Sequence, residues 1–235
     1  MLLFLPHVRG HLTGGLLSPW KNFVALLRDR NAWSGLTLVV ALVFGHFTMI
    51  PFLSPHLVYN LKLPENLLSL VYVIGGLLTV VSAPWIGRLS DRYGRSRVFT
   101  GVVCMAALII FLLTHAGPQP VWVTLVLTGA FFVFASGRYV PAQAVLTSAV
   151  PSSQRGAFMS LTSCTRDLFT GLAALMAGKV VISTPTALLR VEWLGGLAIG
   201  ATLLSIWLIR RIQAVKEVVP HENDAAVAAE AMAEG

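Results

Sequence analysis

Charged residues are scarce in this chain, and their scarcity excludes a water-soluble globule. Only 11% of the 235 residues are Asp, Glu, Lys or Arg, whereas 56% are hydrophobic. A soluble domain carries about 25% charged residues, so too little polar surface remains to cover such a globule. The composition therefore predicts a membrane protein. The net charge of +7 does not indicate nucleic-acid binding, because the basic residues lie between apolar runs and not on one polar face.

Cysteines and enzyme motifs are also sparse, which excludes further classes of protein. The two cysteines, Cys104 and Cys164, lie in separate apolar segments, so no disulfide framework is predicted and we expect buried, inert thiols. The chain has no Gly-x-Ser-x-Gly elbow, no His-Glu-x-x-His metal site and no nucleotide-binding loop. An intramembrane enzyme therefore has no support, and we expect neither a cofactor nor a metal. Residues 1–6 lack the basic start of a secretory signal.

Long apolar runs take up most of the chain. A helix that crosses a bilayer core needs roughly 20 residues. Six runs qualify, namely residues 33–59, 67–86, 98–115, 121–138, 156–182 and 193–210. Because these runs are continuous and do not alternate, they favour helices over barrel strands. We therefore predict an all-α membrane protein, with a six-transmembrane-helix bundle over residues 33–212.

The two ends of the chain differ from this bundle. Residues 1–32 mix Gly, Pro, His and basic residues, and we expect a cytoplasmic loop with a short surface helix. Residues 213–235 are rich in alanine and acidic residues, which predicts a disordered cytoplasmic tail.

Lysine and arginine are unevenly distributed among the predicted connections. One side of the bundle holds Arg9, Lys21, Arg28, Arg30, Arg88, Arg92, Arg95, Arg97, Arg138, Arg155, Arg210, Arg211 and Lys216. The other side holds only Lys62, Lys179 and Arg190. Since cytoplasmic connections carry the excess of Lys and Arg, both termini are predicted to lie in the cytoplasm.

The stretch between the second and third runs is the most distinctive part of the sequence. It reads Gly-Arg-Leu-Ser-Asp-Arg-Tyr-Gly-Arg-Ser-Arg from Gly87 to Arg97. We expect a short loop in which two glycines permit a tight turn and the acid caps a helix or pairs with an arginine of the loop. The candidate gating residues are Gly87, Asp91, Arg92, Gly94, Arg95 and Arg97. A purely topological role for the arginines is the alternative, although topology needs no acid.

Three groups of residues together resemble a known family. They are residues 45–55, residues 72–76 with the following 87–97 stretch, and residues 137–142 with 150–151 and 155–160. The combination resembles the major facilitator superfamily of transporters, in the branch of arabinose-efflux-like sugar and drug exporters. In that branch these segments occur in the same order in the carboxyl-terminal half. The resemblance covers residues 1 to about 212, nearly the whole chain.

This resemblance carries several implications. It implies the carboxyl-terminal six-helix half of a twelve-helix transporter in the plasma (bacterial inner) membrane. The implied activity is secondary active, proton-coupled efflux of a small organic solute such as a sugar or a drug. The implied partner is an amino-terminal six-helix half or a second copy of the chain, with Asp91 engaging a helix end of the other half. A truncated or split subunit that does not transport on its own is the alternative.

Four ionisable residues lie inside the predicted spans, and we regard them as candidates for a substrate or proton pathway. Arg166 and Asp167 lie about ten residues inside the fifth span, roughly 15 Å from its start. A charge there costs several kcal/mol unless it is paired or hydrated. The two residues are therefore either functional groups in a polar cavity or a local ion pair.

The other two candidates are His46 and Arg138. His46 lies midway along the first span, where it either carries a proton or is a buried histidine with a backbone or hydroxyl partner. Arg138 precedes Pro141 by three residues. It is expected to meet an anionic substrate, to stabilise a broken helix end or to snorkel to the interface. Separately, the Gly196-x-x-x-Gly200 pattern predicts close packing between neighbouring helices.

Overall fold

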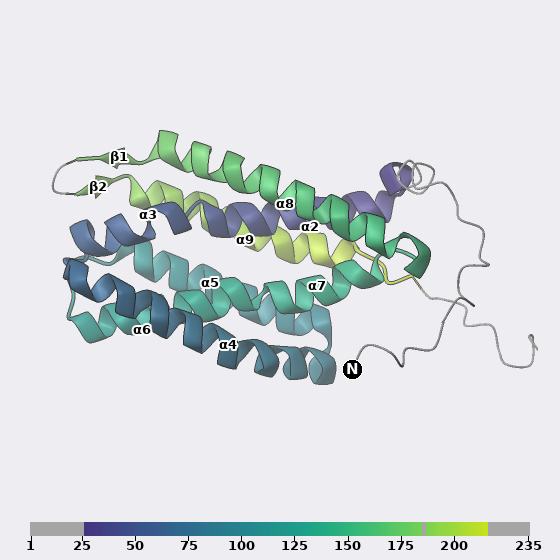
Figure 1. Ribbon diagram of the computed structural model, residues 1–235, viewed down its shortest axis with the longest axis horizontal. Coiled ribbons are helices and arrows are strands. Elements are labelled where there is room, and N and C mark those ends of the chain that lie inside the picture. The colour runs from purple at the N-terminus through teal and green to yellow at the C-terminus, as the bar shows by residue number, and fades with distance from the viewer. Residues whose placement is uncertain (1–25, 185–186, 216–235) are drawn as a thin grey trace, which may run out of the picture.

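The computed structural model describes residues 26–184 and 187–215, and within them long helices lie side by side in one bundle (Figure 1). The elements are α2 (Arg30–Phe47), α3 (Ile50–Pro55), a π-helical turn η1 (His56–Asn60), a 3-10 turn η2 (Glu65–Leu67), α4 (Leu68–Tyr93), α5 (Arg95–His115), α6 (Val121–Gly137), α7 (Tyr139–Ser148), α8 (Ser152–Val180), β1 (Ile182–Ser183), β2 (Leu188–Leu189) and α9 (Val191–Arg211). The antiparallel strands β1 and β2 form a small hairpin that joins α8 to α9.

Five helical stretches of the described residues are long and apolar enough to cross a membrane. They are Arg30–Asn60, Glu65–Tyr93, Arg95–His115, Val121–Ser148 and Val191–Arg211. A mostly helical, multi-pass membrane protein is therefore confirmed. Helix α8 occupies the predicted run 156–182 and is 29 residues long, but charged residues within it keep it out of this set. The sixth crossing stays a prediction.

The predicted loop from Gly87 to Arg97 is wrong in form. Helix α4 continues to Tyr93 and α5 begins at Arg95, so only Gly94 lies outside a helix. Nothing after Ile86 stops the helix, because an isolated glycine such as Gly87 is tolerated inside one. Gly94 has a φ of +94°, which side-chain-bearing residues rarely adopt. The turn therefore depends on Gly94 alone, and the arginines lie on two helix ends.

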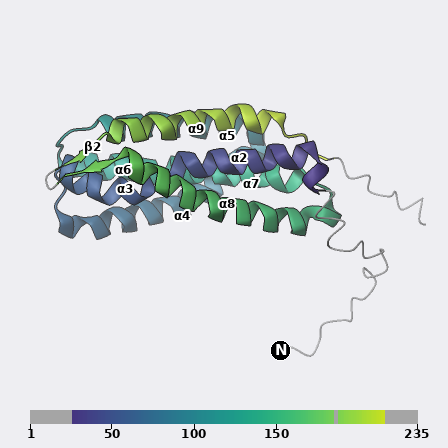
Figure 2. The same ribbon diagram turned by 90° about the horizontal axis from the view of Figure 1, so that it is seen from above.

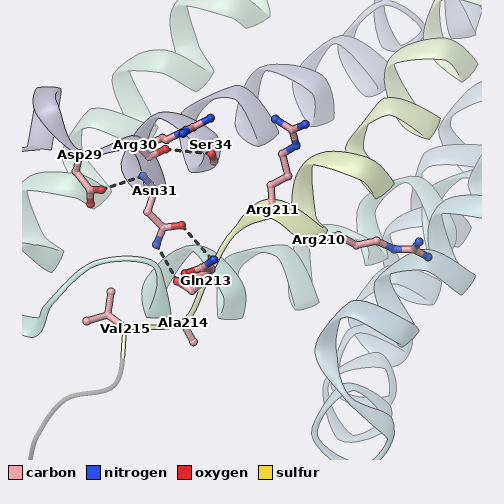
Figure 3. Close-up of a pocket in the computed structure, with 9 residues that line it drawn as sticks. All are labelled: Asp29, Arg30, Asn31, Ser34, Arg210, Arg211, Gln213, Ala214 and Val215. Carbon is pink, nitrogen blue, oxygen red and sulfur yellow. Dashed lines mark hydrogen bonds between the residues drawn. The ribbon is translucent and has the colours of Figure 1, made fainter.

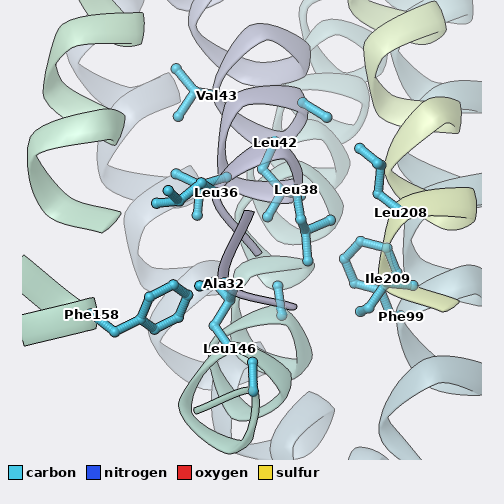
Figure 4. Packing of buried hydrophobic residues seen from close by; sticks show 14 of the residues in the cluster. Ala32, Leu36, Leu38, Leu42, Val43, Phe99, Leu146, Phe158, Leu208 and Ile209 are labelled. Atoms are coloured by element: carbon cyan, nitrogen blue, oxygen red, sulfur yellow. The ribbon is translucent and has the colours of Figure 1, made fainter. Parts of the chain in front are cut away.

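Apolar packing holds the helices together along their length. One cluster joins α2, α5, α7, α8 and α9, and it includes Leu38, Leu42, Phe99 and Phe158 (Figure 4). Figures 1 and 2 both show α8 along the outside of α2. Helix α8 accordingly buries only Phe158 and three small residues. It lies at the periphery of the bundle.

Two expectations about small residues are wrong. Cys104 and Cys164 are both exposed, because they lie on the outward faces of α5 and α8. Gly196 and Gly200 face open space, since a Cβ at either position would meet no atom within 4 Å. Close helix contacts occur instead at other glycines, among them Gly45.

The predicted surface helix within residues 1–32 and the predicted tail 213–235 lie largely outside the described residues. Of the first, Leu26–Arg28 is helical, and Leu26 is buried. The start of the second is attached to the bundle, because the Val215 N–H donates to the Ser148 carbonyl at 2.9 Å. For these few residues at its start, the prediction of disorder is wrong.

Candidate functional site

Two proline-interrupted helices meet in the interior of the bundle. Pro51 cannot donate to the Phe47 carbonyl, and α2 ends at Phe47. Pro141 cannot donate to the Gly137 carbonyl, and α6 ends at Gly137. A proline inside a helix removes one hydrogen bond and clashes with the preceding turn. Interrupted helices at membrane depth are tolerated where they line a cavity or are buried in protein.

A cavity of about 410 Å³ lies beside these two interruptions. It is lined by Val39, Leu42, His46, Phe47, Tyr139, Ala142, Gln143, Leu146, Thr162, Ser163 and Arg166. These residues come from α2, α7 and α8, so three helices that are far apart in sequence form its wall. Among the described residues that line it, none is acidic. Apolar walls with a few polar groups are typical of small-molecule sites.

His46 is held in this wall by aromatic rings. Its imidazole stacks on Phe131 with ring centroids 5.9 Å apart, and it meets the rings of Phe47 and Tyr139 edge-on. The side chain is only 9% exposed, yet its Nδ1 has no hydrogen-bond partner among the described residues. The expected backbone or hydroxyl partner is therefore not found there. A buried nitrogen without a partner is costly, which suits a group that bonds a ligand or water.

Arg138 lies behind the cavity wall and is completely buried. Its Nη1 donates to Thr202 Oγ1 at 2.6 Å, and its Nη2 donates to the Leu42 carbonyl at 3.3 Å. The expectation that it snorkels to the interface is wrong, because it reaches inward to α2 and α9. Its Nε has no partner in the described part of the chain, and no carboxylate there pairs with it.

Tyr139 connects this buried arginine to the cavity. Its hydroxyl donates to the same Leu42 carbonyl at 3.1 Å. Leu42 and Tyr139 both line the cavity, so the guanidinium of Arg138 is hydrogen-bonded to a residue of the cavity wall. A buried charge such as that of Arg138 is screened less by solvent than an exposed one. Arg138 therefore adds a buried positive charge near the cavity to the charge of Arg166 in its lining.

Arg166 and Asp167 form the local ion pair that was one of the two expectations. Arg166 Nε lies 3.3 Å from Asp167 Oδ1, and the side chains are 45% and 74% exposed. Such an exposed pair contributes little to stability. Only Arg166 lines the cavity, because successive residues of a helix point about 100° apart. Arg166 therefore lines the same cavity as His46, whereas Asp167 lies outside it.

The candidate gating residues lie away from this cavity, at the ends of α4 and α5. Asp91 is exposed and makes no hydrogen bond or ion pair with the described residues, so the expected pairing with Arg92 or Arg95 is not seen there. The Arg92 guanidinium lies over the Tyr93 ring at 5.4 Å. Arg95 Nη1 donates to the Ala144 carbonyl at 2.9 Å and so ties α5 to α7. Gly87 is helical and Arg97 is exposed.

A larger hollow of about 740 Å³ opens at the arginine-bearing end of the bundle (Figure 3). Asn31 lies in it and ties three segments together. Its Nδ2 donates to the carbonyls of Ala149 and Gln213 at 2.6 and 2.7 Å, and its Oδ1 accepts from the Gln213 N–H at 3.0 Å. The arginines around it are exposed side chains. We assign the candidate site to the smaller cavity, because the buried residues His46 and Thr162 form part of its wall.

Comparison with known proteins identifies the family. Residues 36–231, most of the chain, match the model of the Major Facilitator Superfamily. The chain belongs to the major facilitator superfamily. It is similar to the "Uncharacterized MFS-type transporter YbcL" of Bacillus subtilis (strain 168), with 22% identity over 217 residues, 91% of this chain. The chain spans about half, 54%, of the length of that relative. The resemblance is confirmed for the superfamily, whereas the exporter branch and the carboxyl-terminal half stay predictions.

Several residues of the site were missed by reasoning from sequence. Tyr139, Gln143, Thr162 and Ser163 line the cavity but carry no formal charge, so the search for ionisable groups passed over them. Tyr139 was detectable, because it follows Arg138 directly at a proline-interrupted point. Thr202 had no local signal, since its role depends on how α9 packs.

Proposed function

We propose that this chain is the carboxyl-terminal half of a secondary active transporter that exports a small organic solute, such as a sugar or a drug, coupled to protons. The observation that carries the proposal is the 410 Å³ cavity at two interrupted helices. Discontinuous helices that frame a site deep in the bundle are a recurrent feature of secondary transporters. His46 in its wall is the proton-carrying candidate, because it is an ionisable residue whose buried Nδ1 has no hydrogen-bond partner among the described residues.

The exposed face of α8 supports the half-transporter proposal. Its amino-terminal part exposes Ser160, Cys164 and Asp167, whereas α5 exposes apolar residues such as Leu108 and Phe111. Polar side chains are avoided on surfaces that face lipid. We therefore propose that α8 is a sixth membrane span whose outer face meets water or a further helical bundle. That bundle is an amino-terminal six-helix half or a second copy of this chain.

The distribution of charge supports an orientation. The ends of α4, α5 and α9 that carry arginines gather at one end of the bundle with the start of α2 (Figure 1). We propose that this end is cytoplasmic, in the plasma (bacterial inner) membrane, with both termini on that side. Asp91, which is exposed there and has no partner among the described residues, is proposed to latch onto the other half. A bias of a few kcal/mol is enough for such a latch.

The test is transport by the purified chain in proteoliposomes with an imposed proton gradient, using labelled arabinose, ethidium and the aromatic anion salicylate as solutes. We expect a gradient-driven flux of at least one of them, and slower flux in Asp91→Asn. Glu65→Gln is the matched control, because Glu65 is also an exposed acid but lies in η2, before the start of α4 and far along the chain from Asp91. Equal flux in Asp91→Asn and wild type, at equal abundance, would remove the latch.

The alternative is a truncated or split subunit that does not transport alone. This alternative, like the first proposal, fits the half-length match to the relative. It predicts no flux from this chain alone, and flux after co-reconstitution with a six-span chain encoded directly upstream of Met1. Absence of flux in both arrangements would contradict transport itself.

A further inference from the structure

We infer that the cavity between α2, α7 and α8 binds an organic anion, with a carboxylate, sulfonate or phosphate group held by Arg166 and His46. The inference rests on the proposed function only in taking this cavity as the solute site. The inferred ligand class is narrower than sugars and drugs in general, because a site for organic anions disfavours neutral polyols and excludes cationic drugs.

The available hydrogen-bond donors carry the first step. Arg166 lines the cavity, and only its Nε contacts Asp167. Its two Nη atoms make no hydrogen bond with the described residues, so one edge of the guanidinium is open. That edge matches the two oxygens of a carboxylate or a phosphate. His46 adds a buried imidazole that has no hydrogen-bond partner in the described part of the chain.

The balance of charge carries the second step. Arg138 and Arg166 contribute two positive charges at or directly behind the wall, and Asp167 is the one acid beside them among the described residues. Asp167 does not line the cavity and is 74% exposed, so solvent screens it more than it screens Arg138. The local excess is positive. A cationic ligand would meet this excess without any carboxylate in the wall to offset it.

The shape of the cavity carries the third step. Val39, Leu42, Ala142 and Leu146 form an apolar part of the wall, and a volume of about 410 Å³ is in the range of small drug-sized ligands. An anion with an aromatic or aliphatic body therefore fits better than a compact inorganic ion. Its charged end lies between Arg166 of α8 and His46 of α2, and its body packs against the apolar residues of α2 and α7.

The experiment measures binding to the purified full chain in lipid nanodiscs, with salicylate and its neutral analogue salicylamide as a matched pair. We expect at least about tenfold tighter binding of salicylate, the factor that one charge-assisted hydrogen bond supplies. Benzenesulfonate and phenyl phosphate extend the anionic series. Equal affinity for salicylate and salicylamide, or no binding of any of the three anions up to about 10 mM, would overturn the inference.

Variants locate the site. Arg166→Gln is expected to weaken salicylate binding about tenfold. Arg166→Lys is expected to weaken it by a smaller factor, because lysine keeps the positive charge but lacks the paired N–H donors of the guanidinium. Asp167→Asn is expected to bind salicylate as tightly as wild type or more tightly. Lys179→Gln is the matched control, because Lys179 is another exposed cation of α8 outside the cavity lining. Wild-type affinity in both folded Arg166 variants, or an equal loss in Lys179→Gln, would overturn the assignment.

This result is separable from the proposed transport. Salicylate binding without flux in proteoliposomes would leave the anion site standing and remove the transport proposal. Flux of arabinose or ethidium without any anion binding would support the transport proposal and remove the anion site.

Discussion

The hydrogen bond between Arg138 and Thr202 is expected to be one of the strongest single contacts in the bundle. Both residues are completely buried, and Arg138 Nη1 donates to Thr202 Oγ1 at 2.6 Å. Thr202→Val replaces the acceptor with a methyl group of nearly the same shape. The guanidinium would then keep only its longer 3.3 Å bond to the Leu42 carbonyl.

The expected cost follows from this loss. A hydrogen bond to a charged group contributes about 1.5–3 kcal/mol, and more is lost when the charge is left buried without a partner. No water replaces Thr202 easily, because a Cβ built at Gly45 would already touch its hydroxyl. We therefore expect Thr202→Val to lower the free energy of unfolding by about 1.5–3 kcal/mol.

The assay is equilibrium unfolding in mixed micelles, with a double-mutant cycle that includes Arg138→Met. In the Arg138→Met background, Thr202→Val is expected to cost almost nothing, because the donor is gone, and the coupling energy equals the lost bond. Thr100→Val is the matched control, since Thr100 is half-buried on α5 and its hydroxyl bonds only the Ser96 carbonyl. A cost below about 0.5 kcal/mol, or the same cost in both backgrounds, would refute the reasoning.

Three further predictions concern other parts of the bundle. Gly94→Ala should lower the free energy of unfolding by about 1–3 kcal/mol, because Gly94 has a φ of +94°; helical Gly101→Ala, with open space at its Cβ position, should be neutral or stabilising in the same titration. Asn31→Ala should cost about 1–3 kcal/mol, because it removes three hydrogen bonds, and an unchanged unfolding midpoint would contradict this. A membrane-impermeant maleimide should label Cys164 faster than Cys104 in liposomes. Both thiols are exposed, but only Cys164 lies on a polar helix face. Equal labelling rates would contradict the proposal that this face of α8 meets water or a partner.

Sequence reasoning located the helices because long apolar runs leave few alternatives in a bilayer. It placed the end of α4 two turns too early, since charged residues after Ile86 suggest a loop although nothing in them stops a helix. It also chose the wrong glycines. The Gly196-x-x-x-Gly200 pattern faces outward, whereas Gly45 lies against α9 and Arg138. A spacing rule describes one helix, but close approach depends on which face its neighbour covers.

Reasoning from charge alone found His46, Arg138 and Arg166 because ionisable groups are costly at membrane depth, but it could not separate their roles. Their roles differ because of contacts between helices, which the sequence does not show. Arg138 bonds across to α2 and α9 and is completely buried, whereas Arg166 opens into the cavity from α8. Gly45 permits the contact between Arg138 and Thr202, because any side chain there would displace both.

The Leu42 carbonyl accepts hydrogen bonds from both Arg138 and Tyr139. Tyr139 lines the cavity, and Arg138 contacts Thr202 of α9 beside Gly45. A ligand that moves Tyr139 would therefore disturb the hydrogen bonding of the Leu42 carbonyl, which Arg138 also uses. Because buried hydrogen bonds favour discrete arrangements over gradual ones, we expect ligand occupancy and the packing of α2 against α9 to be coupled. The unfolding titration of Thr202→Val with and without salicylate measures this coupling: a smaller stabilisation by salicylate in the variant supports it, and an equal stabilisation contradicts it.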